Sequence, residues 1–234
     1  DRLDTSLQRN LSNLIFKGEI SELSKTQNSQ PAIMAVSIAI LAALKSEKLI
    51  QNNSYQAVAG HSLGEYSALV ANGSITFEDS AKLLKTRSKA MQESMPIGTG
   101  GMVAIIGTNI DSIENILLSA SSYGKIFVAN DNADGQVVLS GEIEAINFIV
   151  NNKKELNIKR AIKLPVSAPF HCELMKNASN VLSSEIKKIN FDKFNVPLYS
   201  NVTASICSEL EIGDLLVKQV VSKVRWRETI QNMM

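Results

Sequence analysis

Cysteine and histidine are scarce in this chain of 234 residues, which has two of each. The two cysteines, Cys172 and Cys207, are too few to build a disulfide scaffold, and no group of cysteines and histidines has metal-ligand spacing. The sequence therefore predicts a protein of a reducing compartment, the cytoplasm, without a metal site.

An excess of charge of either sign is also lacking. Lys and Arg number 24 against 23 Asp and Glu, which leaves a formal net charge of +1, and the charges are spread along the chain. A polyanion-binding surface needs a concentration of positive charge. Nucleic acid is therefore not expected as a partner.

Long hydrophobic runs are missing as well. The longest nearly apolar stretch, residues 31–44, is shorter than the roughly 20 residues that cross a bilayer, and Ser37 interrupts it. We expect a buried core helix that begins with Pro31 at its first position, and no membrane association. The first residues carry no secretory signal pattern, and because no initiator Met precedes Asp1, the sequence reads as a fragment.

What is present is an alternation of helical and strand patterns, which favours an α/β fold whose parallel sheet is covered by helices. Residues 55–59 predict a strand, and helical spacing resumes after residue 64 and ends at Gly73. Thr76 fits an N-cap for the next helix, which carries Arg87. Further elements are expected at residues 173–189 (helix), 196–200 (strand) and 213–221 (helix).

A different rhythm separates the middle of the chain from its two ends. Patterns for strand, helix, strand, strand, helix and strand follow one another between residues 98 and 167, the order of a ferredoxin-like unit. Residues 1–97 and 168–234 would then form one discontinuous core. The expected elements are residues 102–107, 110–120, 126–129, 136–140, 143–156 and 160–166.

Residues 60–64 read Gly-His-Ser-Leu-Gly, a G-x-S-x-G sequence between a predicted strand and a predicted helix. Small residues are needed there because the serine stands on a strained turn that exposes its hydroxyl, and we expect a Cβ at either glycine to clash. Ser62 is the candidate nucleophile, and the Leu63 amide is one candidate oxyanion donor. The alternative is an ordinary glycine-rich turn with a capping serine.

A serine nucleophile needs a base, and only two histidines are available. His61 neighbours the serine on a sharp turn, where adjacent side chains diverge, which leaves His171 by elimination. No third triad member stands out: Asp192 and Asp214 are candidates by sequence proximity alone, and a main-chain carbonyl is an alternative.

Arg87 lies within the apolar arc of its predicted helix, among Leu83, Leu84, Ala90 and Met91. No carboxylate stands three or four residues away, so the partner of a buried guanidinium would be a distant acid or a ligand. A bidentate guanidinium suits a carboxylate, which predicts a substrate with a free acid group.

Several segments together give the chain a close resemblance to the malonyl-CoA:acyl carrier protein transacylase family over nearly its whole length. They include GHSLGEYSALVANG and LPVSAPFHCELM, with Arg87 lying twenty-five residues after the serine. The others, in the family's order, are TQNSQPAIMAVSIAIL, GMVAIIG, VANDNADGQVVLSG, VPLYSNVTA and VRWRETI.

The resemblance implies an α/β-hydrolase-like parallel-sheet core with an inserted ferredoxin-like subdomain. It further implies that malonyl-CoA acylates Ser62, that His171 is general base and then acid, and that Arg87 holds the malonyl carboxylate. Acyl carrier protein would then accept the malonyl group on its phosphopantetheine thiol, in fatty acid synthesis, and the protein itself would need no cofactor. By the same resemblance, Gln30 lines the pocket, the Gln219 carbonyl orients His171, and Asn130 and Asn132 lie near the thioester donor.

Two family segments have no match here: an initial strand with a Gly-Gln-Gly-Ser-Gln loop that gives a second oxyanion amide, and a final Glu-Val-Gly-Pro-Gly segment. The resemblance therefore implies a chain truncated at both ends. Alternative interpretations are a serine esterase or thioesterase, an acyltransferase domain of a polyketide synthase, and a docking module for the carrier with an inactive site.

Overall fold

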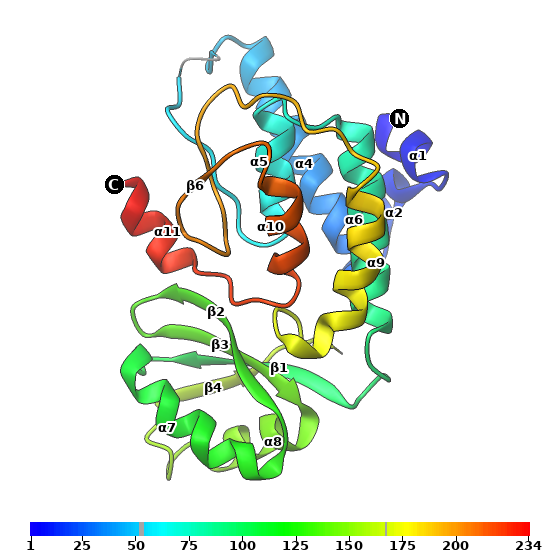
Figure 1. Cartoon of the computed structure of the whole chain (residues 1–234). Helices are drawn as coiled ribbons and strands as arrows, with labels where there is room; N and C mark the ends of the chain where they lie inside the picture. The colour runs from blue at the N-terminus through cyan, green and yellow to red at the C-terminus, as the bar shows by residue number, and fades with distance from the viewer. Residues whose placement is uncertain (52–53, 167) are drawn as a thin grey trace.

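The computed structural model describes residues 1–51, 54–166 and 168–234, apart from the side chain of Asp111. A helical part and a smaller part built on a four-stranded sheet make up the described chain (Figure 1). The helical part is formed by both ends of the chain, and the sheet part by its middle (Figure 1).

The helical part contains two sets of elements, one from each end of the chain. The first set is α1 (Arg2–Leu7), α2 (Leu11–Lys17), α3 (Ile20–Leu23), α4 (Thr26–Ser46), α5 (Gly64–Ala71) and α6 (Phe77–Glu93). The second set is η2 (Glu173–Met175), α9 (Lys176–Ile186), β5 (Leu198–Tyr199), β6 (Ile206–Cys207), α10 (Ile212–Gln219) and α11 (Trp226–Met233). Neither β6 nor α11 was expected from the sequence.

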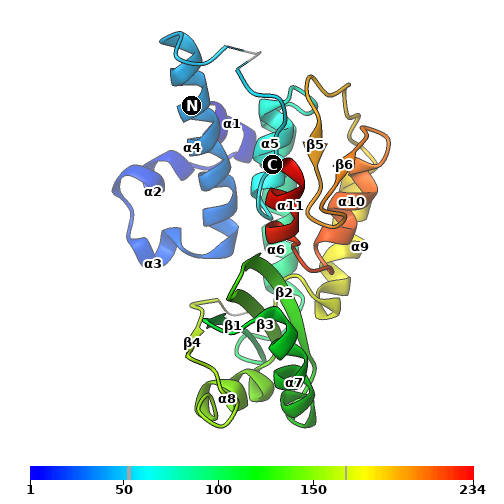
Figure 2. The same cartoon turned by 90° about the vertical axis from the view of Figure 1, so that its left-hand side faces the viewer.

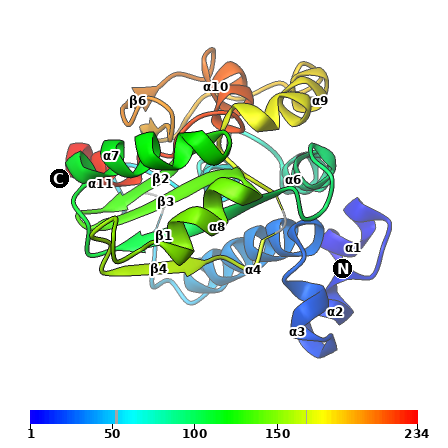
Figure 3. The same cartoon turned by 90° about the horizontal axis from the view of Figure 1, so that it is seen from below.

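The sheet part has the expected order of elements. It comprises β1 (Gly100–Ile106), α7 (Ile110–Ala120), η1 (Ser121–Tyr123), β2 (Ile126–Ala133), β3 (Gln136–Glu142), α8 (Ile143–Asn151) and β4 (Arg160–Lys163). The strands lie in the order β2-β3-β1-β4 with antiparallel neighbours, as in a ferredoxin-like unit. Figure 3 shows α7 and α8 together on one face of this sheet.

Alternation along β1 explains how the sheet part forms a core. Val103 and Ile105 pack in the cluster that includes residues of α7 and α8, whereas Met102 and Ala104 pack in a second cluster. β4 ends at Lys163 rather than at residue 166, and Pro165 has no N–H with which to continue a ladder. The division into residues 98–167 and the rest stays a proposal, and its boundary residue Ser167 lies outside the described residues.

The apolar helix differs from its expectation in two ways. α4 begins at Thr26, so Pro31 lies inside it; the carbonyl of Gln27, which a proline cannot use, instead accepts a hydrogen bond from Arg9 at 2.8 Å. Its burial is also incomplete. α4 packs against α5 and α6, but Ile33 and Ile40 are exposed by 52% and 56%. By length and composition α4 could cross a membrane, a test that core helices of soluble proteins also pass.

The strand expected over residues 55–59 is reduced to one bridge. Val58 pairs in parallel with Leu198, and no other strand pairs with it in the described part of the chain. The expected helix after His171 is also shorter, because residues 173–175 form a 3-10 turn and α9 ends at Ile186.

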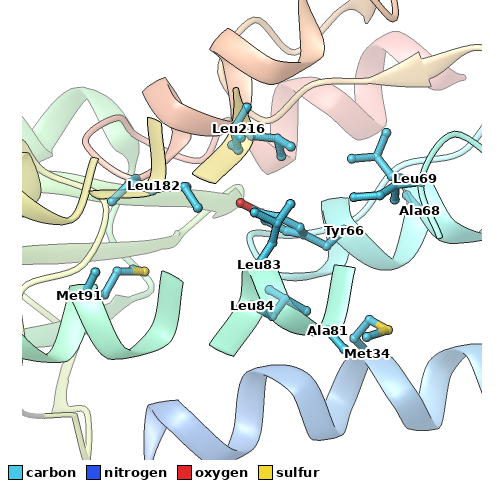
Figure 4. Packing of buried hydrophobic residues seen from close by; sticks show 14 of the residues in the cluster. Met34, Tyr66, Ala68, Leu69, Ala81, Leu83, Leu84, Met91, Leu182 and Leu216 are labelled. Atoms are coloured by element: carbon cyan, nitrogen blue, oxygen red, sulfur yellow. The ribbon is translucent and has the colours of Figure 1, made fainter. Parts of the chain in front are cut away.

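The main core lies between α4, α5, α6, α9 and α10, and Figure 2 shows α4 standing beside α5 and α6. Figure 4 shows the packed side chains that meet around Tyr66, which is fully buried. They are Met34 from α4, Leu69 from α5, Leu83 and Leu84 from α6, Leu182 from α9 and Leu216 from α10. This packing fixes α5 and α6 relative to each other, and these two helices carry the serine and arginine described next.

Candidate active site

The nucleophile turn begins directly after the Val58 bridge and ends where α5 begins. Ser62 has a φ of +55°, a left-handed conformation that is strained for a side-chain-bearing residue. A Cβ at Gly60 would lie 1.9 Å from the Gly64 carbonyl oxygen, so that glycine is required. The same expectation for Gly64 was wrong, because its Cβ would meet no atom within 4 Å.

Asn201 holds this turn in place from the loop after β5. Its side-chain oxygen accepts the Ser62 amide at 2.7 Å, and its side-chain nitrogen donates to the Gly60 carbonyl at 2.7 Å. Asn201 is fully buried, so both bonds are protected from water. The sequence pattern did not identify this residue, because an asparagine in a loop is usually explained by the turn itself.

His171 and Ser62 are within hydrogen-bond distance, with 2.7 Å between Nε2 and Oγ. The other ring nitrogen, Nδ1, lies 2.9 Å from the main-chain oxygen of Gln219. Because a carbonyl only accepts, Nδ1 carries the proton and Nε2 is free to accept one from the serine. Of the alternatives that the sequence left open, this carbonyl holds the position of the third group, whereas Asp192 and Asp214 are exposed.

The electrostatics of the site keep His171 neutral. Burial, and then the positive charge of Arg87, lower the pKa of His171 to about 3. The helix end invoked from the sequence is a smaller influence, because α9 begins only at Lys176. A neutral imidazole beside a serine hydroxyl is ready to act as a general base.

Arg87 projects from α6 into the same site and is only 1% exposed. Its guanidinium donates to the Gln30 side-chain oxygen at 2.5 Å, to the Gln219 side-chain oxygen at 2.8 Å and to Ser62 Oγ at 3.0 Å. Its Nε has no partner, and no carboxylate forms an ion pair with it in the described part of the chain. Burial lowers the pKa of Arg87, but a guanidinium stays charged in a protein.

Two buried groups beside these residues were not identified from the sequence. The Gln219 side chain, expected only for its carbonyl, also donates from Nε2 to the Ser62 carbonyl at 3.0 Å and to Glu65 at 2.6 Å. Glu65 is completely buried in the first turn of α5. An acid in a first helical turn is commonplace, so the sequence carried no signal of its burial.

The remaining expected residues lie at different distances from the chemistry. His61 does not contact the serine hydroxyl in the described contacts; its Nε2 lies 2.8 Å from Oδ1 of Asn132 and its ring packs edge-on against Trp226. Asn130 is buried on β2, where it bridges to Val224 rather than to the group around Ser62. Leu63 directly precedes α5, which places its main chain beside the nucleophile.

Similar proteins agree on one family. All residues, 1–234, match the acyl transferase domain family. The malonyl CoA-acyl carrier protein transacylase of Bacillus subtilis is 38% identical over 235 residues, covering 100% of this chain and 73% of the relative, and the one from Escherichia coli K12 is 39% identical over 94% of this chain and 71% of its own.

Solved structures give the same result. The acyl-carrier-protein-S-malonyltransferase of Bartonella henselae superposes with a TM-score of 0.94 at 42% identity, covering 98% of this chain and 74% of its own. A complex of a type II polyketide synthase acyl carrier protein with its malonyl-transacylase gives a TM-score of 0.92 at 37% identity, covering 98% and 72%. These neighbours confirm the expected fold class, and the chain therefore belongs to the acyl transferase domain family.

Proposed function

We propose that this chain transfers the malonyl group of malonyl-CoA to the phosphopantetheine thiol of acyl carrier protein, through a malonyl ester on Ser62. One observation carries the proposal: Arg87 is buried without a carboxylate partner in the described chain, and its guanidinium lies 3.0 Å from Ser62 Oγ. An acyl group attached to that oxygen with a carboxylate at its far end supplies the missing anion.

In the first half-reaction, His171 Nε2 takes the Ser62 proton while Oγ attacks the thioester carbonyl. The Leu63 amide donates to the developing oxyanion, and the imidazolium, held by the Gln219 carbonyl, then returns the proton to the departing CoA thiolate. In the second half-reaction, the thiol of the carrier gives its proton to His171 and attacks the ester. The carbon–sulfur bond forms, the carbon–oxygen bond breaks, and Ser62 recovers its proton.

Gln30 and the asparagines have supporting roles in this proposal. Gln30 accepts from Arg87, which leaves the second guanidinium nitrogen directed at the serine. Asn132 holds His61, and together with Asn130 it lies on β2, where the thioester donor would pass. No metal or other cofactor takes part in these steps.

The relatives named above give the biological setting that we propose. Their printed names assign them to malonyl transfer onto acyl carrier protein. We accordingly place this enzyme in fatty acid synthesis, as a soluble protein of the cytoplasm with acyl carrier protein and malonyl-CoA as its partners. The polyketide complex indicates that the same chemistry serves a second pathway in related enzymes.

The test is transfer to a carrier protein followed by intact mass spectrometry. With malonyl-CoA and the phosphopantetheine form of the carrier, we expect a malonyl adduct on the carrier that is absent with Ser62→Ala and with a carrier lacking phosphopantetheine. Release of free malonate without any carrier adduct would instead support the thioesterase alternative and contradict the proposal.

A further inference from the structure

Glu65 is a buried acid to which the proposed reaction assigns no role. Its side chain is completely inaccessible, yet no basic group forms an ion pair with it among the described residues. It accepts hydrogen bonds from Gln219 Nε2 at 2.6 Å, from the Asn201 amide at 3.4 Å and from the Ser200 side chain. A carboxyl kept at this cost in desolvation calls for a functional account.

Gln219 connects this acid to Arg87 through one side-chain amide. Its Nε2 donates to Glu65, and its Oε1 accepts from the Arg87 guanidinium at 2.8 Å. An ionised carboxylate only accepts hydrogen bonds, so the NH2 group of the amide must face Glu65 and the oxygen must face Arg87. The opposite orientation would place NH2 against the guanidinium, donor against donor.

The same amide is tied to the rest of the site. Its Nε2 also donates to the Ser62 carbonyl at 3.0 Å, while the main-chain oxygen of Gln219 holds His171 at 2.9 Å. A change in the amide would therefore displace Arg87 first, because the His171 contact uses main-chain atoms. Glu65 is thus connected selectively to the group that receives the substrate carboxylate.

We propose that Glu65 is a positioning residue for carboxylated acyl groups: through the Gln219 amide, its ionised carboxyl keeps the Arg87 guanidinium directed at the substrate carboxylate. The inference rests on the proposed function and names a determinant of its acyl selectivity. An acyl group without a carboxylate does not use Arg87, so its loading onto Ser62 does not depend on Glu65.

The ionisation of Glu65 makes this role dependent on pH. Burial raises the pKa of Glu65 to about 7. Three ionisable groups face it: Arg87, Tyr66 and Cys207. Burial raises the pKa of Tyr66, and burial raises that of Cys207 to about 12, so both are neutral and Arg87 is the charged one. A protonated Glu65 can donate, which permits the wrong amide orientation and weakens malonyl loading below pH 7.

The experiment measures kcat/KM for loading of Ser62 from malonyl-CoA and, separately, from acetyl-CoA, at pH 6 and pH 8. For Glu65→Gln at pH 8 we expect malonyl loading to fall by about 10-fold, mainly through KM, and acetyl loading to stay within about 3-fold of wild type. The rise in malonyl loading from pH 6 to pH 8 should be present in wild type and absent from Glu65→Gln. His171, with a pKa of about 3, does not titrate in this range.

Ser200→Ala is the matched control, because it removes a hydrogen bond to Glu65 and leaves the Gln219 amide untouched. We expect its malonyl loading to stay within about 3-fold of wild type. Equal losses of malonyl and acetyl loading in Glu65→Gln, or a malonyl KM that falls because a nearby negative charge is gone, would overturn the inference. If wild type does not load malonyl at all, the proposed function fails instead.

Discussion

Three side chains from distant parts of the chain meet at Ser62. His171 lies 2.7 Å from its hydroxyl and Arg87 lies 3.0 Å from it, while Asn201 accepts its amide at 2.7 Å. Each has a separate task at the residue scale: proton transfer, recognition of an anion and support of a strained backbone. Substitutions at single residues should therefore separate these tasks.

Arg87 should control the choice of acyl group rather than the chemistry of the serine. For Arg87→Ala we expect malonyl loading to fall by at least about 30-fold, because a buried charge pair loses one partner. Acetyl loading should fall much less. Arg87→Lys keeps the charge without the planar fork and should recover only part of the malonyl activity. Equal losses for both thioesters, measured as kcat/KM, would contradict this role.

At this scale the sequence identified residues whose chemistry is rare in their setting. A serine between two glycines, one of two histidines and an arginine on an apolar arc each stand out, and the structure brings all three together. Glu65 and Asn201 did not stand out, because their burial depends on contacts between segments 136 residues apart. The side-chain bonds of Gln219 were hidden for the same reason.

At the scale of elements, the nucleophile turn offers a matched pair of substitutions. Gly60→Ala should destabilise the protein by about 3 kcal/mol or more, because its Cβ would lie 1.9 Å from the Gly64 carbonyl oxygen. Gly64→Ala has open space and opens α5, so we expect a change within about 1 kcal/mol. Urea unfolding of the two variants measures this, and similar losses would show that the turn is not closely packed at Gly60.

The elements of the sheet part were predicted well because their signal is local. The helix at residues 110–120 is confirmed without change as α7, and β1 and β3 differ from expectation only at their ends. The strand at residues 55–59 was overpredicted, since a strand exists only where neighbours pair with it and Val58 has one partner, Leu198. α11 was missed because its docking surface lies in another part of the chain.

At the scale of the whole molecule, α11 joins the two parts through Asp131 on β2. Arg227 donates to both carboxylate oxygens, at 3.0 and 2.8 Å, and Asp131 is 1% exposed. Arg227→Ala would leave that carboxylate buried and should cost about 1–3 kcal/mol, with faster hydrogen exchange in α11. Arg2→Ala, which breaks the exposed pair with Glu78, is the control and should cost less than about 1 kcal/mol. Equal costs would mean that Asp131 does not depend on its partner.

The buried acid should also give global stability a characteristic dependence on pH. Folding raises the pKa of Glu65 from 4.5 to about 7, so between these values the folded state holds a proton that the unfolded chain does not. The stability of wild type relative to Glu65→Gln should therefore rise as pH falls from 7 to 4.5, by up to about 1.4 kcal/mol per pH unit. Urea unfolding of both proteins across this range checks it; a constant difference would contradict the raised pKa.

The central claim is that Ser62 carries a malonyl group whose carboxylate is held by Arg87, and intact mass after mixing with malonyl-CoA tests it most directly. We expect wild type to gain the mass of one malonyl group, Ser62→Ala to gain nothing, and Arg87→Ala to prefer acetyl-CoA in a parallel reaction. A malonyl adduct that persists in Ser62→Ala, or one that forms equally well without Arg87, would contradict the account.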